Sequence, residues 1–333
     1  MIDIHDFPKI DAHIHISRFD DCYVDIARGY NMRMININTD ADVFASPKKQ
    51  EEVAIKYCDA HANMFAYITT FHAEDYINGD KKIVFDNLDK SLANGAVGVK
   101  IWKNIGMELK NSDGEFLMAS NPLFNDLYTY IIEHHTTLLA HLGEPKNCWL
   151  PLEEMTSERN RLYFSRFPQY HMFLHPNYPS YESHIEARDK IIERFPKLSF
   201  VGAHLGSLEW SIDEIAKRLD LYHNLSVDMA SRINHLQLQS QKEYAAVRNF
   251  VIKYADRLIY GSDVIDDTDK MERCYMENWS YLATDSNECT LESHDKCKGL
   301  NLPYEILEKI YFSNAIDKYR KLDKFSKKKL EQK

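Results

Sequence analysis

The sequence predicts one α/β domain, a (β/α)8 TIM barrel, over residues 1–318. Three observations lead to this prediction. Short apolar segments recur along the chain, and stretches with helical periodicity lie between them. Most of the apolar segments end on a polar residue that could bind a metal or take part in catalysis. Strand followed by helix, repeated along one chain, is typical of parallel barrels, whose functional residues lie at the carboxyl ends of the strands.

The predicted strands are short runs of continuous or alternating apolar residues, as expected for strands inside a parallel barrel. Many of them contain the β-branched and aromatic residues that favour strands. In chain order they are KIDAHIHI (9–16), MRMININ (32–38), MFAYITTF (64–71), GAVGVKIW (95–102), TLLAHLG (137–143), LSFVGAHLG (198–206), NLSVDM (224–229) and RLIYGSD (257–263).

The predicted helices lie between these strands, where apolar residues recur every three to four positions. They cover residues 46–62, 81–94, 121–135, 183–196, 207–222 and 241–255.

Three segments depart from the regular alternation. Residues 142–197 contain no clear strand and are rich in Trp, Tyr and Pro, which predicts a long insertion after the fifth strand, at the mouth of the barrel. Residues 319–333 form a basic tail that we expect to be frayed or loosely helical. Residues 289–297 have two cysteines and a histidine without the paired spacing of a structural zinc site, and are expected to form a solvent-exposed connection between helices.

The first strand carries two histidines, His13 and His15, in an otherwise apolar run. Side chains alternate along a strand, so both imidazoles point to one side while Ala12, Ile14 and Ile16 point to the other. Neutral imidazole is the commonest metal ligand in proteins. This motif alone leaves two interpretations open: a metal site, or two core histidines whose nitrogens are satisfied by neighbours.

The residues at the ends of the other strands favour the metal site. Independent structural roles for histidines and an aspartate at so many strand ends would be a coincidence, and these ends meet at one face of a barrel. The strand-end residues are His13, His15, Asn38, His72, Lys100, His141, His204, Asp228 and Asp263.

The order of these residues resembles the amidohydrolase superfamily, and the segments DAHIH, GVKIW, AHLGEP, FVGAHLG and YGSD resemble its amidohydrolase-related branch. That branch includes aminocarboxymuconate-semialdehyde decarboxylase and several lactonases. The resemblance spans nearly the whole chain and ends with LPYEILEKIYFSNAIDKYR (302–320), similar to the closing helix of the branch. It implies that His13, His15, His141 and Asp263 hold one divalent ion, with zinc expected, and that His204 lies beside the metal-bound water.

The chemistry of such a site follows from its residue types. Zinc lowers the pKa of its bound water to about 7 and polarises carbonyl groups. Asp263 would then act as the proton shuttle, and His204 would hydrogen-bond the water or the developing oxyanion. The prediction is a metal-dependent hydrolase of a small ester, lactone or amide; the alternative is a metal-dependent, non-oxidative decarboxylase of a small carboxylic acid.

Two strand-end residues have several interpretations. Lys100 is a carboxylated bridging lysine, a cation for a substrate carboxylate, or a buried charge in a salt bridge, and the last two are preferred. Asp228 either holds the second nitrogen of a ligand histidine or caps a helix, and the helix cap is preferred.

The insertion offers residues for substrate contact. Aromatic and proline-rich loops suit a cyclic substrate, and an arginine suits a carboxylate. Each of these side chains also has a simpler interpretation, in which it only packs the insertion onto the barrel. With Lys100, the candidates for substrate binding are Glu144, Arg166, His175 and Tyr178, and Trp149 and Tyr181 lie in the same segment.

Composition restricts the partners. The formal net charge of -10 argues against nucleic acid or an anionic membrane as the main partner, which leaves a small-molecule substrate. Six scattered cysteines and the absence of a signal-like N-terminus or a membrane-length apolar run predict a soluble, cytoplasmic protein with free thiols. A homo-oligomer is compatible with the sequence.

Overall fold

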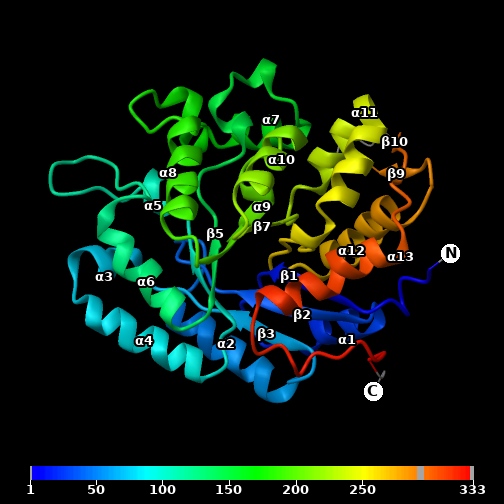
Figure 1. Cartoon of the computed structure of the whole chain (residues 1–333), viewed down its shortest axis with the longest axis horizontal. Coiled ribbons are helices and arrows are strands. Elements are labelled where there is room, and N and C mark those ends of the chain that lie inside the picture. Colours follow the sequence, from blue (N-terminus) through cyan, green and yellow to red (C-terminus); the bar gives the residue numbers. More distant parts are fainter. Residues whose placement is uncertain (1, 291–295, 331–333) are drawn as a thin grey trace.

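The centre of the fold is a barrel of short parallel strands that follow the sequence order (Figure 1). The computed structural model describes residues 2–290 and 296–330. All eight predicted strands are confirmed, and each is shorter than its apolar run. They are β1 (Lys9–Ile14), β2 (Met32–Ile37), β3 (Phe65–Ile68), β4 (Gly98–Ile101), β5 (Thr137–Ala140), β6 (Ser199–Gly202), β7 (Leu225–Asp228) and β8 (Leu258–Ile259).

The strands form two hydrogen-bonded ladders, β1-β2-β3 and β4-β5-β6-β7-β8. Backbone hydrogen bonds join the ladders at both seams, although neither seam forms a continuous ladder. Between β3 and β4, the Lys100 N–H donates to the Thr69 carbonyl at 2.7 Å. Between β8 and β1, the Ala12 N–H donates to the Tyr260 carbonyl at 3.0 Å. The predicted (β/α)8 architecture is therefore confirmed, with two irregular seams.

Helices surround the strands, and every predicted helix is present. Several helices begin at a side chain that accepts a hydrogen bond from the first turn, as Asp80 does from Lys82 N and Ser180 from Ser183 N. The long helices are α1 (Asp21–Gly29), α2 (Pro47–Ala60), α4 (Lys81–Ala93), α6 (Asn125–Glu133), α8 (Tyr181–Arg194), α10 (Ile212–Leu221), α11 (Ile233–Lys253) and α12 (Thr268–Ala283); the closing segment is α13 (Tyr304–Glu308), a π-helical turn (Lys309–Ser313) and α14 (Asn314–Lys318).

Among the described residues, none of the helices combines the length and the apolar character that crossing a membrane requires.

The apolar core has two main layers. The larger layer packs the strands against the surrounding helices. The inner layer fills the barrel with side chains such as Ile10, Ile35 and Val201, and it also includes Tyr319 and Phe325 from the end of the chain. Aromatic residues from the C-terminal segment therefore complete the packing inside the barrel.

The prediction that the tail is frayed or loosely helical is wrong for residues 319–330. The α14 helix ends at Lys318, and the chain beyond it packs without helix, with Leu322, Phe325 and Leu330 buried. The Leu330 N–H also donates to the Asn31 side chain at 3.1 Å. Apolar residues spaced among the lysines provide this packing, which the basic composition conceals. Residues 331–333 lie outside the described part of the chain.

The segment between β5 and β6 contains no strand, as the sequence predicts. It consists of 3-10 turns, the helix α7 (Glu158–Arg166) and the helix α8, which lie in the upper part of Figure 1. A small apolar cluster holds it together, with Cys148, Met155 and Phe164 among its buried members.

Residues 289–297 differ from the prediction of a fully exposed connection. The strands β9 (Cys289–Thr290) and β10 (Lys296–Cys297) pair as an antiparallel hairpin, in which Cys289 lies opposite Cys297. Both cysteines are buried, because the base of the hairpin packs on α11 and α12. Residues 291–295, including the histidine of this motif, lie outside the described residues.

The packing of the C-terminal segment leads to a prediction for stability. Replacing Phe325 with Ala should lower the free energy of unfolding by about 3–5 kcal/mol, the usual cost of removing a buried phenylalanine. Denaturant unfolding of the full chain measures this change. The control is Asp323→Ala, an exposed residue two positions away, which should change stability by less than about 0.5 kcal/mol. Equal stability of the two variants would contradict the packing described here.

Candidate metal centre and substrate cavity

His13 in β1 and His15, directly after β1, reach the inside of the barrel through a β-bulge. The register of β1 against β2 shifts between Asp11 and Ile14. Because of this shift, Ala12 packs in the inner core layer, whereas Ile14 packs in the outer layer. The predicted grouping of Ala12 with Ile14 and Ile16 is therefore wrong. A bulge changes which face successive side chains occupy, so His13 and His15 follow Ala12 into the interior.

Asp263 comes from the segment that follows β8. Its N–H donates to the His13 carbonyl at 2.8 Å, and the next residue, Val264, accepts at its carbonyl from His15 N at 2.8 Å. Asp263 has a positive φ of 59°, which an aspartate tolerates better than most residues. Gly261 permits the close approach, because a Cβ there would lie 2.7 Å from the Cβ of His13.

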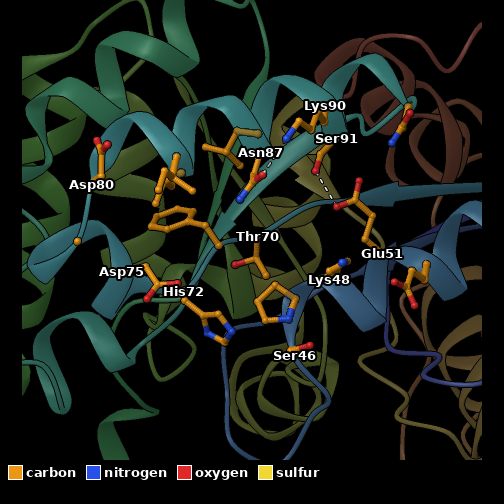
Figure 2. Close-up of a pocket in the computed structure, with 18 of the residues that line it drawn as sticks. Ser46, Lys48, Glu51, Thr70, His72, Asp75, Asp80, Asn87, Lys90 and Ser91 are labelled. Carbon is orange, nitrogen blue, oxygen red and sulfur yellow. Dashed lines mark hydrogen bonds between the residues drawn. The ribbon is translucent and has the colours of Figure 1, made fainter.

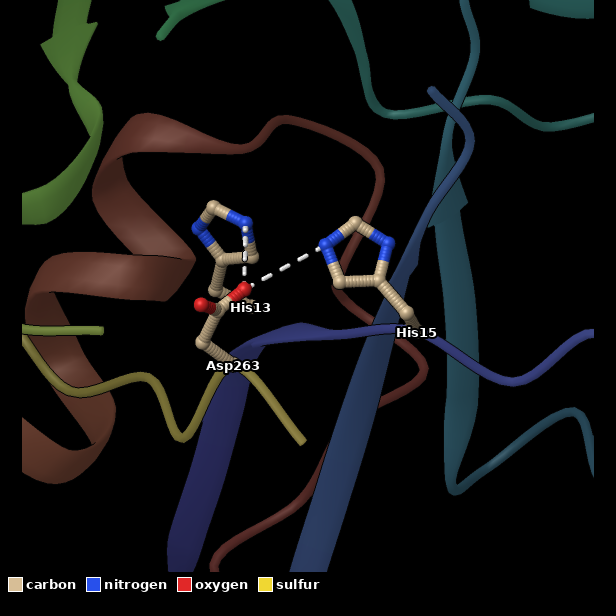
Figure 3. A group of neighbouring side chains, drawn as sticks. All are labelled: His13, His15 and Asp263. Atoms are coloured by element: carbon tan, nitrogen blue, oxygen red, sulfur yellow. Dashed lines mark ion pairs between the residues drawn. The ribbon is translucent and has the colours of Figure 1, made fainter. Parts of the chain in front are cut away.

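His13, His15 and Asp263 form one cluster (Figure 3). One nitrogen or oxygen atom from each residue lies within 4.8 Å of the others. The Oδ1 atom of Asp263 is 3.4 Å from Nε2 of His15 and 3.7 Å from Nε2 of His13. Figure 3 shows both rings directed at this carboxylate.

The opposite ring nitrogens are engaged elsewhere, and this fixes the tautomers. Nδ1 of His15 lies 2.8 Å from the Ile37 carbonyl, which can only accept, so Nδ1 carries the proton and Nε2 presents a lone pair. Nδ1 of His13 lies 2.7 Å from the Asp228 carboxylate. A carboxylate or carbonyl on the far nitrogen is the usual support of a metal-ligating histidine.

Burial keeps the site imidazoles neutral. Desolvation lowers the pKa of His15 to about 4 and that of His204 to about 3. It also lowers the pKa of His141 well below its usual value. Near pH 7 these rings therefore offer lone pairs, which is the form that binds a metal.

The donor set fits a divalent cation. Nε2 of His13 and Nε2 of His141 are buried and have no hydrogen-bond partner among the described residues. The Nε2 lone pair of His15 also faces the Oδ1 atom of Asp263. Neither atom carries a proton, so they cannot form a hydrogen bond with each other. Buried acceptors that converge in this way are costly unless a cation lies between them. Two imidazoles and a carboxylate are ligands that suit zinc and other divalent ions.

Asp228 supports the candidate ligand His13 and is not the predicted helix cap. The helix α11 begins at Ile233, and its N-cap is Arg232. The Asp228 carboxylate instead accepts from Nδ1 of His13 at 2.7 Å and from the His204 N–H at 2.7 Å. Its pKa is lowered, since these interactions with His13 and His204 outweigh the rise that burial alone would cause.

His141 and His204 lie beside the cluster but outside its 4.8 Å limit. The centre of the His204 ring is 4.3 Å from that of His141 and 5.0 Å from that of His13. Nδ1 of His204 lies 2.8 Å from the Ala230 carbonyl, so Nε2 is an acceptor. In this state His204 can take a proton or hold a water, but it cannot donate to an oxyanion, which modifies its predicted role.

A cavity of about 370 Å³ opens beside these residues. His15, His141, His204 and Asp263 line it together with cationic and aromatic side chains. The cations are Lys100, Lys103, Arg159 and Arg232, and the aromatic residues include Phe44, Trp102, Tyr163 and Phe164.

Among these cations, Lys100 is the one that was predicted from the sequence. It is almost fully buried, and no carboxylate of the described residues lies within ion-pair distance of its ammonium. The salt-bridge interpretation is therefore wrong. Burial lowers the pKa of Lys100 to about 8, and the charges of Asp263 and Asp228 limit the fall.

The other predicted substrate contacts have different positions. Glu144 lines the cavity, but its carboxylate is paired with Lys103. Arg166 stacks on the Phe167 ring, His175 lies 3.2 Å from the Pro168 carbonyl, and Tyr178 packs on Phe116. None of these last three lines the cavity, because their side chains pack within the insertion and against Phe116.

Sequence analysis missed most of the cavity wall. Phe44, Trp102 and Lys103 follow strand ends by a few residues, which is a usable signal. Arg159 comes from α7, and Arg232 comes from the loop after β7. Their positions depend on how the loops fold, and no motif identifies them.

A larger cavity of about 940 Å³ lies on the outside of the barrel, along α2 and α4 (Figure 2). Its Glu51 carboxylate accepts from the Ser91 hydroxyl at 2.7 Å and from the Tyr67 hydroxyl at 3.0 Å. The strand-end residue His72 lies here, 2.8 Å from Asp40, and not at the metal cluster. Cavity size alone therefore does not locate the candidate site.

The fold and the site define an α/β barrel that gathers potential metal ligands after its first and last strands. A family model described as amidohydrolase matches residues 10–321. The chain therefore belongs to the amidohydrolase family. This confirms the resemblance seen in the sequence. No curated protein sequence matches the chain.

Solved structures with the same fold include two aromatic-acid decarboxylases. A dihydroxybenzoic acid decarboxylase from Polaromonas sp. JS666, with bound manganese and 2-nitroresorcinol, has a TM-score of 0.57 and 13% identity, covering 93% of this chain and 96% of its own. A 2,6-dihydroxybenzoate decarboxylase from Rhizobium has a TM-score of 0.55 and 13% identity, covering 93% of this chain and 97% of its own.

A third structure, 5-carboxyvanillate decarboxylase from Sphingomonas paucimobilis, has a TM-score of 0.52 and 11% identity, covering 94% of this chain and 99% of its own. At these identities the likeness establishes the fold.

The lone-pair cluster leads to a prediction for metal content. Protein prepared without chelator should contain about one divalent ion per chain, because the cluster provides one set of converging donors. Elemental analysis should show that the double variant His13→Ala, His15→Ala loses this ion. Replacing His204 with Gln should leave it bound.

The matched control is His72→Ala, which removes an imidazole from the outer cavity and should leave the metal content unchanged. Retention of the ion by the His13, His15 double variant would show that the ligands are elsewhere. Loss of the ion from the His204 variant would make His204 a ligand.

Proposed function

We propose that the protein is a metal-dependent, non-oxidative decarboxylase of a small aromatic or similarly planar carboxylic acid. The sequence alone favours hydrolysis, because the two candidate cations, Lys100 and Arg166, are not securely placed near the metal. The proposal is supported mainly by one observation: the buried Lys100 ammonium, without an acidic partner among the described residues, lies in the cavity that also contains Asp263. Asp263 and Asp228 act on this charge only from beyond ion-pair distance, so an anionic ligand that contacts the buried ammonium would be favoured.

The rest of the cavity supports an anionic, planar substrate. Four cationic side chains line it, against the two carboxylates of Glu144 and Asp263. This is the reverse of the whole chain, whose formal net charge is -10. Phe44, Trp102 and Phe164 offer flat apolar surfaces for a ring.

We propose that His13, His15 and Asp263 hold one divalent ion, with His141 as a further candidate ligand and zinc as the first candidate metal. The manganese in the Polaromonas decarboxylase makes manganese the second. When bound, the ion supplies Lewis-acid polarisation of substrate oxygen atoms. Lys100 would hold a substrate anion and orient it toward Asp263.

In this reaction the bond between the ring carbon and the carboxylate breaks, and carbon dioxide leaves. The electron pair stays on the ring carbon and takes up a proton that comes from water, and the hydroxide that remains combines with carbon dioxide as bicarbonate. Asp263, whose carboxyl pKa is held well below its usual value by the neighbouring histidines, would relay this proton to the ring carbon. His204, with its Nε2 lone pair, would accept a hydrogen bond from a substrate hydroxyl group or from water.

Hydrolysis is the second candidate, and the tautomer of His204 favours it. A neutral imidazole with a free Nε2 beside the metal cluster could take the proton of an attacking water. Hydrolysis does not require a cation in the cavity. A requirement for Lys100 in turnover would therefore distinguish decarboxylation from hydrolysis.

A substrate panel tests the reaction class. Hydroxybenzoates and other aromatic acids form one arm, followed by carbon dioxide release; lactones, esters and N-acyl amino acids form the other, followed by acid release. We expect metal-dependent carbon dioxide release that is lost in Asp263→Asn. Turnover confined to the hydrolysable compounds would reject decarboxylation and support the second candidate.

Lys100 gives the expected pH dependence. Its pKa is about 8, so the ammonium that binds the anion predominates below pH 8 and is lost above it. The KM for an aromatic acid should therefore rise above pH 8. Lys100→Met should raise KM at pH 7 by about 10- to 100-fold, since a hydrogen bond to a charged group contributes roughly 1.5–3 kcal/mol.

Lys90→Met is the control, because Lys90 lines the outer cavity. A KM that does not change in Lys100→Met would remove Lys100 from the binding site.

A further inference from the structure

Residues 204–207, directly after β6, form a left-handed turn. Their φ angles are 59° for His204, 57° for Leu205, 64° for Gly206 and 58° for Ser207. L-residues visit this region singly and at a steric cost, and glycine alone adopts it freely. A run with three non-glycine residues persists only where the surrounding contacts hold it. The candidate catalytic residue His204 is its first member.

Two contacts hold the first residue of the turn. The His204 N–H donates to the Asp228 carboxylate at 2.7 Å, and its Nδ1–H donates to the Ala230 carbonyl at 2.8 Å. Asp228 is the last residue of β7 and Ala230 lies two residues beyond it, so the end of this strand holds the first residue of the turn.

The other end of the turn is held from α8. The Tyr181 hydroxyl donates to the Ser207 carbonyl at 2.5 Å. The Trp210 indole N–H donates to the Tyr181 oxygen at 2.8 Å, which leaves the hydroxyl proton free for Ser207. Arg188 donates to the Gly206 carbonyl.

Tyr181 and Arg188 are both buried, and neither lines the substrate cavity. Gly206 leaves room for the guanidinium, because a Cβ there would lie 3.1 Å from a nitrogen of Arg188. The α8 helix therefore donates to two successive carbonyls of the strained turn.

We propose that Tyr181 and Arg188 are positioning residues for His204, which act by holding the left-handed turn in place. Without either donor, a buried carbonyl loses its partner and the turn can relax toward ordinary φ angles. The His204 ring then changes its position relative to Asp263 and His141. Displacements of about 1 Å at a reacting group can reduce rates by about 100-fold. The catalytic consequence rests on the proposed function, whereas the position of the ring does not.

The test uses Tyr181→Phe with Tyr128→Phe as a matched control. Tyr128 is also fully buried, and its hydroxyl donates to the Ala119 carbonyl at 2.7 Å, away from the site. Each substitution removes one buried hydroxyl from one carbonyl, so both should lower the melting temperature. Only Tyr181→Phe should change the environment of His204.

The direct readout is nuclear magnetic resonance of the full chain labelled with ¹⁵N-histidine, with His204 assigned from a His204→Gln variant. We expect the ring signals of His204 to shift or split in Tyr181→Phe and to match wild type in Tyr128→Phe. Where turnover is measurable, kcat should fall about tenfold or more in Tyr181→Phe, with KM changed less than twofold.

Arg188 is tested by Arg188→Met and Arg188→Lys. The lysine variant keeps a cationic donor and should restore part of the His204 signal pattern and of kcat. If Arg188→Met does not fold, the tyrosine pair still decides. His204 signals in Tyr181→Phe identical to wild type would overturn the proposal, whether or not an aromatic acid is turned over. A wild-type protein without any decarboxylation would reject the proposed function and leave the resonance test intact.

Discussion

The backbone hydrogen bonds across the β8–β1 seam are the constraint on which the candidate site depends. They place Asp263 against His13, and Val264 against His15, although β8 itself is only two residues long. Asp11 reinforces this seam: its carboxylate accepts from the Ser262 N–H at 2.9 Å and from the Tyr275 hydroxyl at 3.1 Å. Hydrogen bonds between the end of the first strand and the segment after the last strand thus hold the candidate ligands together.

Electrostatics explains the remainder of the site. Burial holds His15 and His204 neutral, and the backbone carbonyls that contact their Nδ1 atoms direct their Nε2 lone pairs inward. The adjoining cavity carries excess positive charge inside an acidic protein. Such a surface favours a divalent ion and an anionic substrate. The insertion supplies part of the cavity wall, and it also supplies the α8 helix that holds the His204 turn.

Sequence analysis could predict the strands, the barrel and the strand-end residues, because buried parallel strands have a strong apolar signal and their ends meet at one face. It could not predict the bulge that moves Ala12 and Ile14 to different layers, since one extra residue leaves no trace in composition. The sequence offers support of a ligand histidine by Asp228 only as the less preferred interpretation, and it does not identify His13, which lies 215 positions away in the chain. The contacts of Arg166, His175 and Tyr178 could not be predicted either, because they depend on how a long insertion folds.

Anomalous diffraction from crystals of the metal-loaded protein tests the central claim most directly. The convergence of lone pairs predicts one strong peak between Nε2 of His13, Nε2 of His15 and the carboxylate of Asp263, at bonding distances of about 2.0–2.2 Å for zinc. A peak at the outer cavity near His72, or no peak inside the barrel of a protein with one ion per chain, would contradict it.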